Sequence, residues 1–186
     1  ESQATPTSFA LRGVWGSAVT DLWAVSDMGR LLHNDGSGWG VHTTYDGTDL
    51  LAIWGSGQGD IWAVGERGFT AHYDGTAWSV VATPIGTDLT SVWGTAPTNV
   101  YAVGREGHVL RWDGAQWSQP ARYTGADLYG VWVHGTSEQL WAVGQNGTML
   151  SGTGSHLPNV NRVPTNTLHC VAGGSTLTYF AGDGLR

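Results

Sequence analysis

The sequence contains no lysine, one cysteine and few charged residues, 12% of its 186. Its eight basic residues are all arginine and are outnumbered by 15 acidic residues, so the net charge is −7. A nucleic-acid-binding surface needs a basic stripe to neutralise phosphates, and this composition therefore argues against a nucleic-acid partner. Because Cys170 is alone, it excludes an internal disulfide and a cysteine metal cluster.

Long apolar runs and helical periodicity are also missing. No stretch approaches the roughly 20 apolar residues of a membrane span, so we expect no membrane insertion. None has the charged start and apolar middle of a signal peptide, so we expect either a cytosolic chain or one whose export signal has been removed. Glycine, with 29 residues, and tryptophan, with 11, are abundant instead. This composition is typical of a turn-dense, aromatic-rich β protein.

One stretch, Leu50 to Trp78, is restated with changes upstream as Leu11 to Trp39 and downstream as Leu89 to Trp117. A series of tryptophans is spaced 39 residues apart, at Trp15, Trp54, Trp93 and Trp132. The fourth copy has one extra residue, in the loop 133–139. A period near 40 indicates a solenoid or propeller, in which no single repeat can bury its own apolar face. We expect one domain over residues 1–186.

Each copy reads as four short strands separated by turn residues. In the second copy we expect strands A to D at 50–54, 61–64, 69–73 and 78–82. Asp-Gly pairs such as Asp74-Gly75 lie between strands C and D, where a tight hairpin needs positive φ angles. Four antiparallel strands per repeat make one propeller blade. The predicted fold class is therefore an all-β propeller.

We expect five blades, at 11–49, 50–88, 89–127, 128–167 and 168–186. The last copy stops before its Asp-Gly turn, and residues 1–10 would complete it, because Ser2 to Pro6 resemble a strand D. A small residue lies two positions before each strand A tryptophan, which suits a narrow ring; the series is Gly13, Ala52, Ser91, Gly130 and, in the fifth copy, Cys170. We expect Cys170 to be a small buried thiol.

The pattern Val-Trp-Gly-Ser/Thr, then Asp-Leu/Ile-Trp-Ala-Val-Gly, then Asp-Gly-x-x-Trp resembles tandem propeller repeats of bacterial surface and secreted proteins, particularly of myxobacteria. It is more distantly similar to Asp-box (BNR) and photosystem-assembly-factor repeats. The resemblance implies a secreted or cell-surface location. The Asp-Gly-x-x-Trp turn is also similar to one in small propeller lectins, but the arginine and glutamate that those lectins repeat are absent here.

Aromatic side chains are the first candidates for binding, since an aromatic face stacks on the apolar face of a sugar. We expect the tryptophans of strands A and B to be core. The aromatic residues of strands C and D lie further out and are candidate ligand contacts: Trp39, Trp78, Trp117, Trp112 and Tyr73.

The loops between strands B and C and between strands D and A differ from copy to copy. In a propeller both sets emerge on one face, and loops on a rigid scaffold often carry binding residues. The candidates from these loops are Tyr45, Glu66, Arg67, Arg105, Glu106 and Tyr123.

The polar residues of the repeat do not indicate a metal or a reaction. His33 and His72 share one register, but Arg111 follows them, so we expect no metal site and no cofactor. Asp21, Asp60 and Asn99 precede strand B, where we expect them to accept hydrogen bonds from the backbone of the turn. Because no nucleophile elbow, zinc motif or phosphate loop is present, we expect no enzyme.

These observations favour a non-catalytic recognition module whose repeated blades bind a carbohydrate, in a lectin-like and multivalent way, or a protein surface. One alternative is a structural or assembly segment of a larger or oligomeric bacterial surface protein, with self-association through the incomplete fifth blade. A glycoside-processing enzyme is the third hypothesis.

Overall fold

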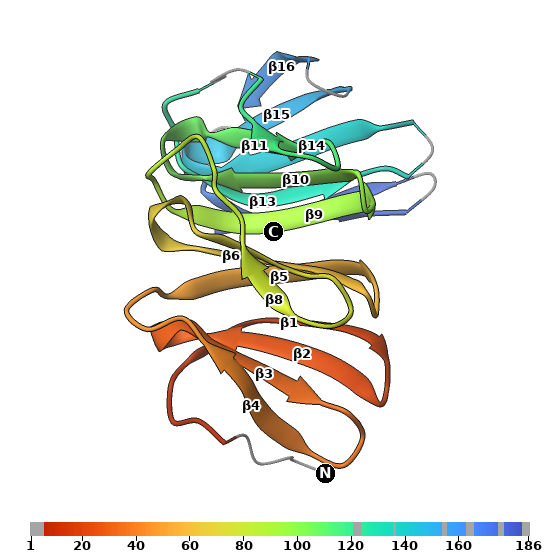
Figure 1. The fold of residues 1–186 in the computed structure, drawn as a ribbon. Coiled ribbons are helices and arrows are strands. Elements are labelled where there is room, and N and C mark those ends of the chain that lie inside the picture. The colour runs from red at the N-terminus through yellow and green to blue at the C-terminus, as the bar shows by residue number, and fades with distance from the viewer. Residues whose placement is uncertain are drawn as a thin grey trace.

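The chain folds into five antiparallel β-sheets in the computed structural model, which describes residues 6–120, 124–135, 137–153, 156–162, 166–174 and 177–183 (Figure 1). Within these residues the regular structure consists of strands and four single 3₁₀ turns. The all-β class and the four-stranded repeat unit predicted from the sequence are confirmed.

Each of the first three sheets follows the expected strand order A to D. The first sheet contains β1 (Leu11–Ala18), β2 (Asp21–Ser26), β3 (Arg30–Asn34) and β4 (Trp39–Thr44). The second contains β5 (Leu50–Gly57), β6 (Asp60–Gly65), β7 (Thr70–Tyr73) and β8 (Trp78–Val80). The third contains β9 (Leu89–Ala96), β10 (Asn99–Gly104), β11 (Val109–Trp112) and β12 (Trp117–Ser118).

The fourth sheet has the same order, and the fifth is shorter. The fourth contains β13 (Leu128–Val133), β14 (Gln139–Gly144), β15 (Thr148–Thr153) and β16 (His156–Arg162). The fifth contains β17 (Leu168–Gly173) and β18 (Thr178–Gly182). A 3₁₀ turn joins the second and third strands of each four-stranded sheet; these turns are η1 (Asp27–Gly29), η2 (Glu66–Gly68), η3 (Arg105–Gly107) and η4 (Gln145–Gly147).

The turns form where the sequence supplies residues that tolerate a positive φ. Gly36, Gly75 and Gly114 of the Asp-Gly hairpins have φ values of 96°, 92° and 100°. Each 3₁₀ turn ends on a glycine with a positive φ, and the residue before it is also left-handed, as in Arg67 with φ 55°. Glycine adopts this region at little cost, so its spacing fixes where each strand ends.

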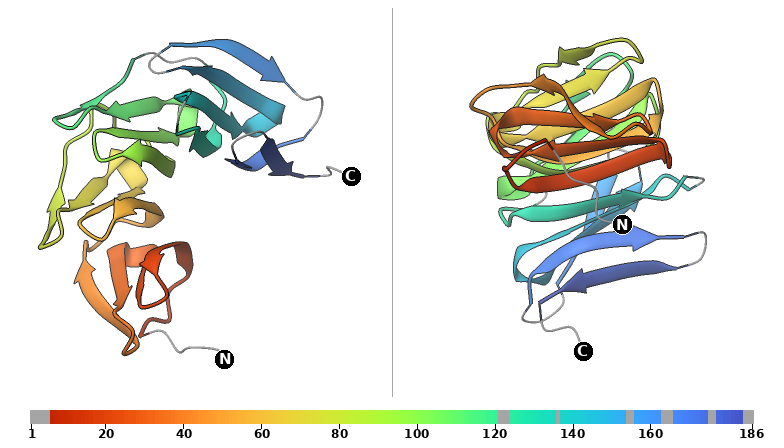
Figure 2. Two further views of the ribbon diagram at one scale, coloured as in Figure 1. Left: turned by 90° about the vertical axis from the view of Figure 1, so that its right-hand side faces the viewer. Right: turned by 90° about the horizontal axis from the view of Figure 1, so that it is seen from below.

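The five sheets stand side by side along an arc, with the first and fifth at its two ends (Figure 2). The innermost strands β1, β5, β9, β13 and β17 pack against one another in that order. The apolar core therefore lies between sheets, as in the cluster that joins Trp23 and Leu31 of the first sheet to Leu50 and Ile61 of the second. No sheet buries both of its faces by itself, which explains the need for repetition.

The small residues predicted for the inner strands lie where neighbouring backbones come close. A Cβ atom added to Gly130 would lie 3.0 Å from the Cα atom of Cys170, and one on Gly13 would lie 3.3 Å from the backbone nitrogen of Ile53. Larger side chains at these positions would push the sheets apart.

The fifth sheet differs from expectation at Cys170, whose side chain is exposed rather than buried. Its neighbour Val171 packs against Trp132 of the fourth sheet, and side chains alternate along a strand, so Cys170 points to the other face of β17. Of residues 1–10, which we expected to complete the fifth blade, residues 1–5 lie outside the described residues. The described Phe9 and Ala10 contact the first sheet: Arg30 lies 4.8 Å over the Phe9 ring, and the Asp27 N–H donates to the Ala10 carbonyl oxygen at 3.1 Å. Among the described residues, β17 and β18 pair only with each other.

Candidate functional site

Four of the aromatic candidates lie in the junctions between sheets. The ring centroids of Tyr73 and Trp78 are 5.1 and 5.6 Å from that of Trp23 in the preceding sheet. The rings of Trp112 and Trp117 lie 4.8 and 5.1 Å from that of Trp62 in the same way. Aromatic residues of strands C and D thus cover the strand B tryptophan of the sheet before them, which leaves little of their surface for a ligand.

The fifth aromatic candidate, Trp39, belongs to the first sheet and has no preceding sheet among the described residues to pack against. It lines a hollow of about 350 Å³ at the outer strands β3 and β4, which we call the rim hollow. This hollow is lined by His33, Asp35, Ser37, Gly38, Trp39, Gly40, Val41 and His42. Burial lowers the pKa of His42, and the neighbouring His33 adds to the effect.

The described loop candidates form clasps between neighbouring sheets. The backbone N–H of Arg67 in η2 donates to Asp88 Oδ1, which precedes β9, at 3.0 Å. The Glu106 N–H makes the equivalent bond to Asp127 at 2.9 Å, and the Arg105 guanidinium bridges Asp88 and Asp127. The backbone bond from Arg67, together with the Arg105 side chain, holds the pKa of Asp88 below its ordinary value despite partial burial.

Two other loop side chains and one backbone group make further contacts here. The Arg67 guanidinium donates to the Gly47 carbonyl oxygen, and the Tyr45 ring packs 4.9 Å from that of Phe69. Burial raises the pKa of Tyr45. Glu66 begins η2, and its N–H donates to the Asp49 carbonyl oxygen. Tyr123 lies outside the described residues. The structure thus gives these loops a role in joining sheets.

A repeated polar network joins the histidines at the end of strand C to the aspartates that begin strand B, two series for which the sequence predicted no contact. His72 Nε2 lies 2.6 Å from Asp60 Oδ1, and its ring stacks on Trp62 with centroids 4.4 Å apart. Ser56 also donates to Asp60. Asp60 thus hydrogen-bonds the side chains of Ser56 and His72, where we had expected the backbone of the turn. The 39-residue spacing of the histidines, and that of the aspartates, indicated a repeat. That His72 bonds to Asp60 could not be predicted without the antiparallel pairing of β6 with β7.

The same network recurs in the two neighbouring sheets. In the first sheet, Asp21 is bonded to His33 at 2.8 Å and accepts from Ser17. In the third, Arg111 Nε donates to Asn99 Oδ1 at 3.3 Å. Burial raises the pKa of Asp60, but the bonds from His72 and Ser56 outweigh it, so the pKa lies below its ordinary value. Because all three networks lie between paired strands of one sheet, we assign them to stability.

Two tryptophans of strand A depart from the predicted core position: Trp15 is half-buried, and Trp93 is the more exposed of the two. Trp93 is 37% exposed, whereas Trp54 and Trp132 at the same register are 6% and 7% exposed. Trp93 borders a hollow of about 430 Å³ at the inner strands β9, β13 and β17, which we call the axial groove. The axial groove is lined by Trp93, Gly94, Thr95, Trp132, Val133, His134, Gly135, Gly173 and Gly174.

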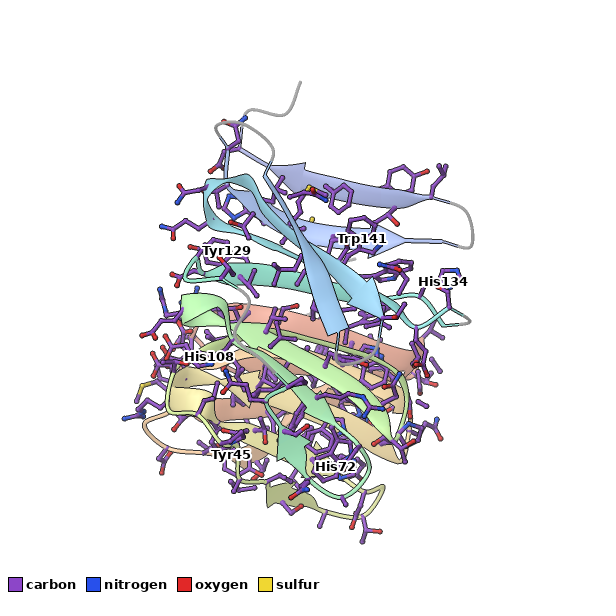
Figure 3. All side chains as sticks on the ribbon, turned by 90° about the horizontal axis from the view of Figure 1, so that it is seen from above. Tyr45, His72, His108, Tyr129, His134 and Trp141 are labelled. Atoms are coloured by element: carbon purple, nitrogen blue, oxygen red, sulfur yellow. The ribbon has the colours of Figure 1, made fainter. Side chains whose placement is uncertain are left out.

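The extra residue of the fourth repeat lies beside the axial groove. The His134 ring packs edge-on to Trp132 with centroids 5.7 Å apart, and its Nδ1 accepts from the Ser137 N–H at 3.3 Å. Figure 3 shows His134 on the side of the molecule opposite to Tyr45, His108 and Tyr129. The groove is therefore separate from the loop clasps. The sequence signals for it were the insertion in 133–139 and the break in the Trp-Gly pair at Val133.

The described residues contain no group of three or more histidine, cysteine, aspartate or glutamate side chains placed to hold a metal ion. Within the same residues, no helix has the length and apolar character needed to cross a membrane.

No protein-family model matches the chain, and no curated protein sequence matches it. Solved structures do match. A structure described as YCF48 bound to D1 peptide has a TM-score of 0.75 at 14% identity, over 97% of this chain and 64% of that one. YCF48 from Cyanidioschyzon merolae has a TM-score of 0.69 at 15% identity, over 91% of this chain and 62% of that one.

A third match is the WD40 β-propeller domain of Doa1, with a TM-score of 0.77 at 10% identity, over 92% of this chain and 60% of that one. The chain thus spans less than two thirds of the length of each structure. Identities this low show the fold alone, which is the β-propeller repeat fold. They support the similarity to photosystem-assembly factors at that level.

Proposed function

We propose that this chain is a non-catalytic binding module that holds a segment of a protein partner in the axial groove. The observation that carries the proposal is the exposure of Trp93, 37%, at a position where the second and fourth sheets bury Trp54 and Trp132. An exposed aromatic residue in an apolar hollow is the usual anchor of a protein interface. The similar YCF48 propeller has been solved with a D1 peptide bound, which is consistent with a propeller in such a role.

The lining favours a protein segment over a carbohydrate. Glycines and apolar side chains form most of the axial groove, and its side chains with hydrogen-bonding atoms are the two indoles, Thr95 and His134. A sugar site needs several polar groups to fix the hydroxyls, whereas an apolar peptide side chain needs apolar area. The lining includes no carboxylate, so it offers no acid–base pair. The resemblance to repeats of bacterial surface proteins supports the further proposal that this binding module lies at the bacterial cell surface.

The test is photo-crosslinking in cells that produce the protein, with p-benzoylphenylalanine in place of Thr95. We expect one or a few protein adducts, lost when Trp93→Ala is combined with the probe and kept with Trp39→Ala. Adducts that persist in the Trp93→Ala protein would show that the axial groove is not the binding site.

A carbohydrate site at the rim hollow is the second candidate. The hollow combines the Trp39 indole with Asp35, Ser37 and two histidines, which is the mixture of aromatic face and polar groups that sugars require. A glycan array should then give signals that Trp39→Ala removes and Trp93→Ala leaves intact. The opposite dependence would exclude the rim hollow.

A role in assembly is the third candidate, since the outer face of the first sheet exposes Leu11, Val14 and Val41. Sedimentation velocity would then show oligomers that Val14→Asp dissociates. A single monomeric species at all concentrations would exclude it.

A further inference from the structure

The strand A tryptophans follow a packing rule at three of the four junctions. Each indole lies over the glycine that follows the tryptophan position in the next sheet. A Cβ atom on Gly55 would lie 2.8 Å from the Trp15 ring, one on Gly94 would lie 2.6 Å from Trp54, and one on Gly173 would lie 2.7 Å from Trp132. Two non-bonded carbon atoms do not approach this closely, so the indole fits only where the next sheet has a glycine.

The junction between the third and fourth sheets breaks this rule. Val133 stands where the other sheets have Gly55, Gly94 and Gly173. Its side chain is buried in the cluster that joins Tyr101 to Leu140. Because the branched valine fills the space over β13, Trp93 has no slot there and is left exposed at the mouth of the axial groove.

The inner strands add main-chain groups to this surface. β9 and β13 are terminal strands of their sheets, paired on one side only with β10 and β14. Their inner edges therefore carry backbone N–H and C=O groups that no described strand pairs. Side chains of β9 already bond two of those on β13: the Val131 N–H donates to Ser91 Oγ at 3.3 Å, and Thr90 Oγ1 donates to the Leu128 carbonyl oxygen at 2.6 Å. An extended peptide can bond such an edge, and pockets beside the edge then select its side chains.

The chemistry of the groove selects the peptide. Two of the four glycines in the lining, Gly135 and Gly174, have nothing within 4 Å of the position of a Cβ atom, so they leave room for a flat, rigid group against the indoles. Aromatic rings and proline stack on indoles at low entropic cost. In the described part of the loop 133–139, Glu138 is the charged residue, which favours a basic residue next to the anchor.

We infer that the axial groove takes an extended peptide segment with a proline or aromatic anchor between Trp93 and Trp132, and that Val133 keeps the groove open. The inference rests on the proposed function and deepens it. Glycine at position 133 would give Trp93 the slot that the other indoles have, so we expect Val133→Gly to close the groove by letting the Trp93 indole pack over β13.

The first arm measures binding of the blocked peptide acetyl-Gly-Arg-Pro-Phe-Gly-Gly-amide to the whole chain by titration calorimetry. We expect saturable binding that weakens at least tenfold with Trp93→Ala, with Val133→Gly, and when alanines replace Pro-Phe in the peptide. Two matched controls should bind as the unaltered chain does. Trp39→Ala removes an indole elsewhere, and Val14→Gly makes the same change in another inner strand.

The second arm follows Trp93 itself by ¹⁹F NMR of 5-fluorotryptophan-labelled protein, with its signal assigned through Trp93→Phe. Val133→Gly should move that signal and remove its solvent isotope shift, while the signals of the other tryptophans report that the fold is intact. A Trp93 signal that stays solvent-exposed in Val133→Gly would overturn the role of Val133.

The two arms separate this inference from the proposed function. If the peptide fails to bind while Thr95 crosslinks still depend on Trp93, the peptide class is wrong and the protein-binding function stands. If both the peptide and the crosslinks are indifferent to Trp93, the proposed function fails as well. Binding of an oligosaccharide to the groove in place of the peptide would also overturn the inference.

Discussion

Leu11 and Val14 of the first sheet occupy the same register as Leu50 and Ile53 of the second, yet their surroundings differ. Leu11 and Val14 are 46% and 68% exposed, whereas Leu50 and Ile53 are 0% and 8% exposed. The residues are of the same kind, and the difference is that the first sheet covers the second while no described sheet covers the first. Burial in this fold is thus a property of the junction rather than of the repeat.

The comparison can be tested most strongly with a charge at matched positions. Ile53→Asp places a carboxylate in the cluster between the first and second sheets, and we expect it to lower the free energy of unfolding by about 4 kcal/mol. Val14→Asp changes the equivalent, exposed position and should cost less than about 0.5 kcal/mol. Urea unfolding followed by tryptophan fluorescence measures both. Equal losses would mean that the first sheet is covered in solution.

The strand D tryptophans give a test of intermediate size. Trp117 is buried against Trp62, and Trp117→Ala should destabilise the chain by about 3 kcal/mol. Trp39 occupies the same register but has no preceding sheet among the described residues, so we expect Trp39→Ala to cost about 1 kcal/mol or less. The same urea experiment applies, and a large loss from Trp39→Ala would contradict the comparison.

The smallest effect concerns the polar networks, which differ between the second and third sheets. Because the pKa of Asp60 is lowered in the folded chain, its stabilising effect is present above the unfolded pKa of about 4 and is lost as the pH falls through the folded pKa. The double change Asp60→Asn with His72→Arg copies the Asn99–Arg111 pair of the third sheet.

We expect this double variant to keep its stability at pH 7 within about 1 kcal/mol, because a hydrogen-bonded pair replaces another. It should also show a smaller loss of stability than the unaltered chain between pH 5 and pH 3. Thermal unfolding across this range is the measurement. An unchanged acid profile would show that Asp60 does not contribute to acid sensitivity.

Much of the fold could be predicted, because the repeat contains its own signals for strands and turns. Positive φ values are found at Gly36, Gly75 and Gly114, where the Asp-Gly pairs predicted hairpins. The strand D tryptophans show the limit of this reasoning. Their outer position suggested ligand contacts, but Trp78 and Trp117 pack on the sheet before them. The sequence pattern identifies the apolar residues but does not show which neighbouring sheet covers them.

The axial groove shows the converse error, a tryptophan predicted to be buried that is exposed. Trp93 is indistinguishable in register from Trp15, Trp54 and Trp132, and we expected all four to be core. We infer that its exposure depends on Val133, which is 40 residues away in the chain and lines the same groove once the third and fourth sheets are packed. The break in the Trp-Gly pair was visible in the sequence, but its consequence was not.

The sequence by itself determined the period, the four strands of each blade and the turns, because local φ requirements and strand periodicity act within one repeat. The tertiary structure alone decided which apolar residues are covered, which side chains bond to one another and where the repeat leaves a groove. The physical reason is that each sheet buries its faces only against its neighbours. A change at one junction therefore alters exposure in the adjacent sheet, where the local sequence is unchanged.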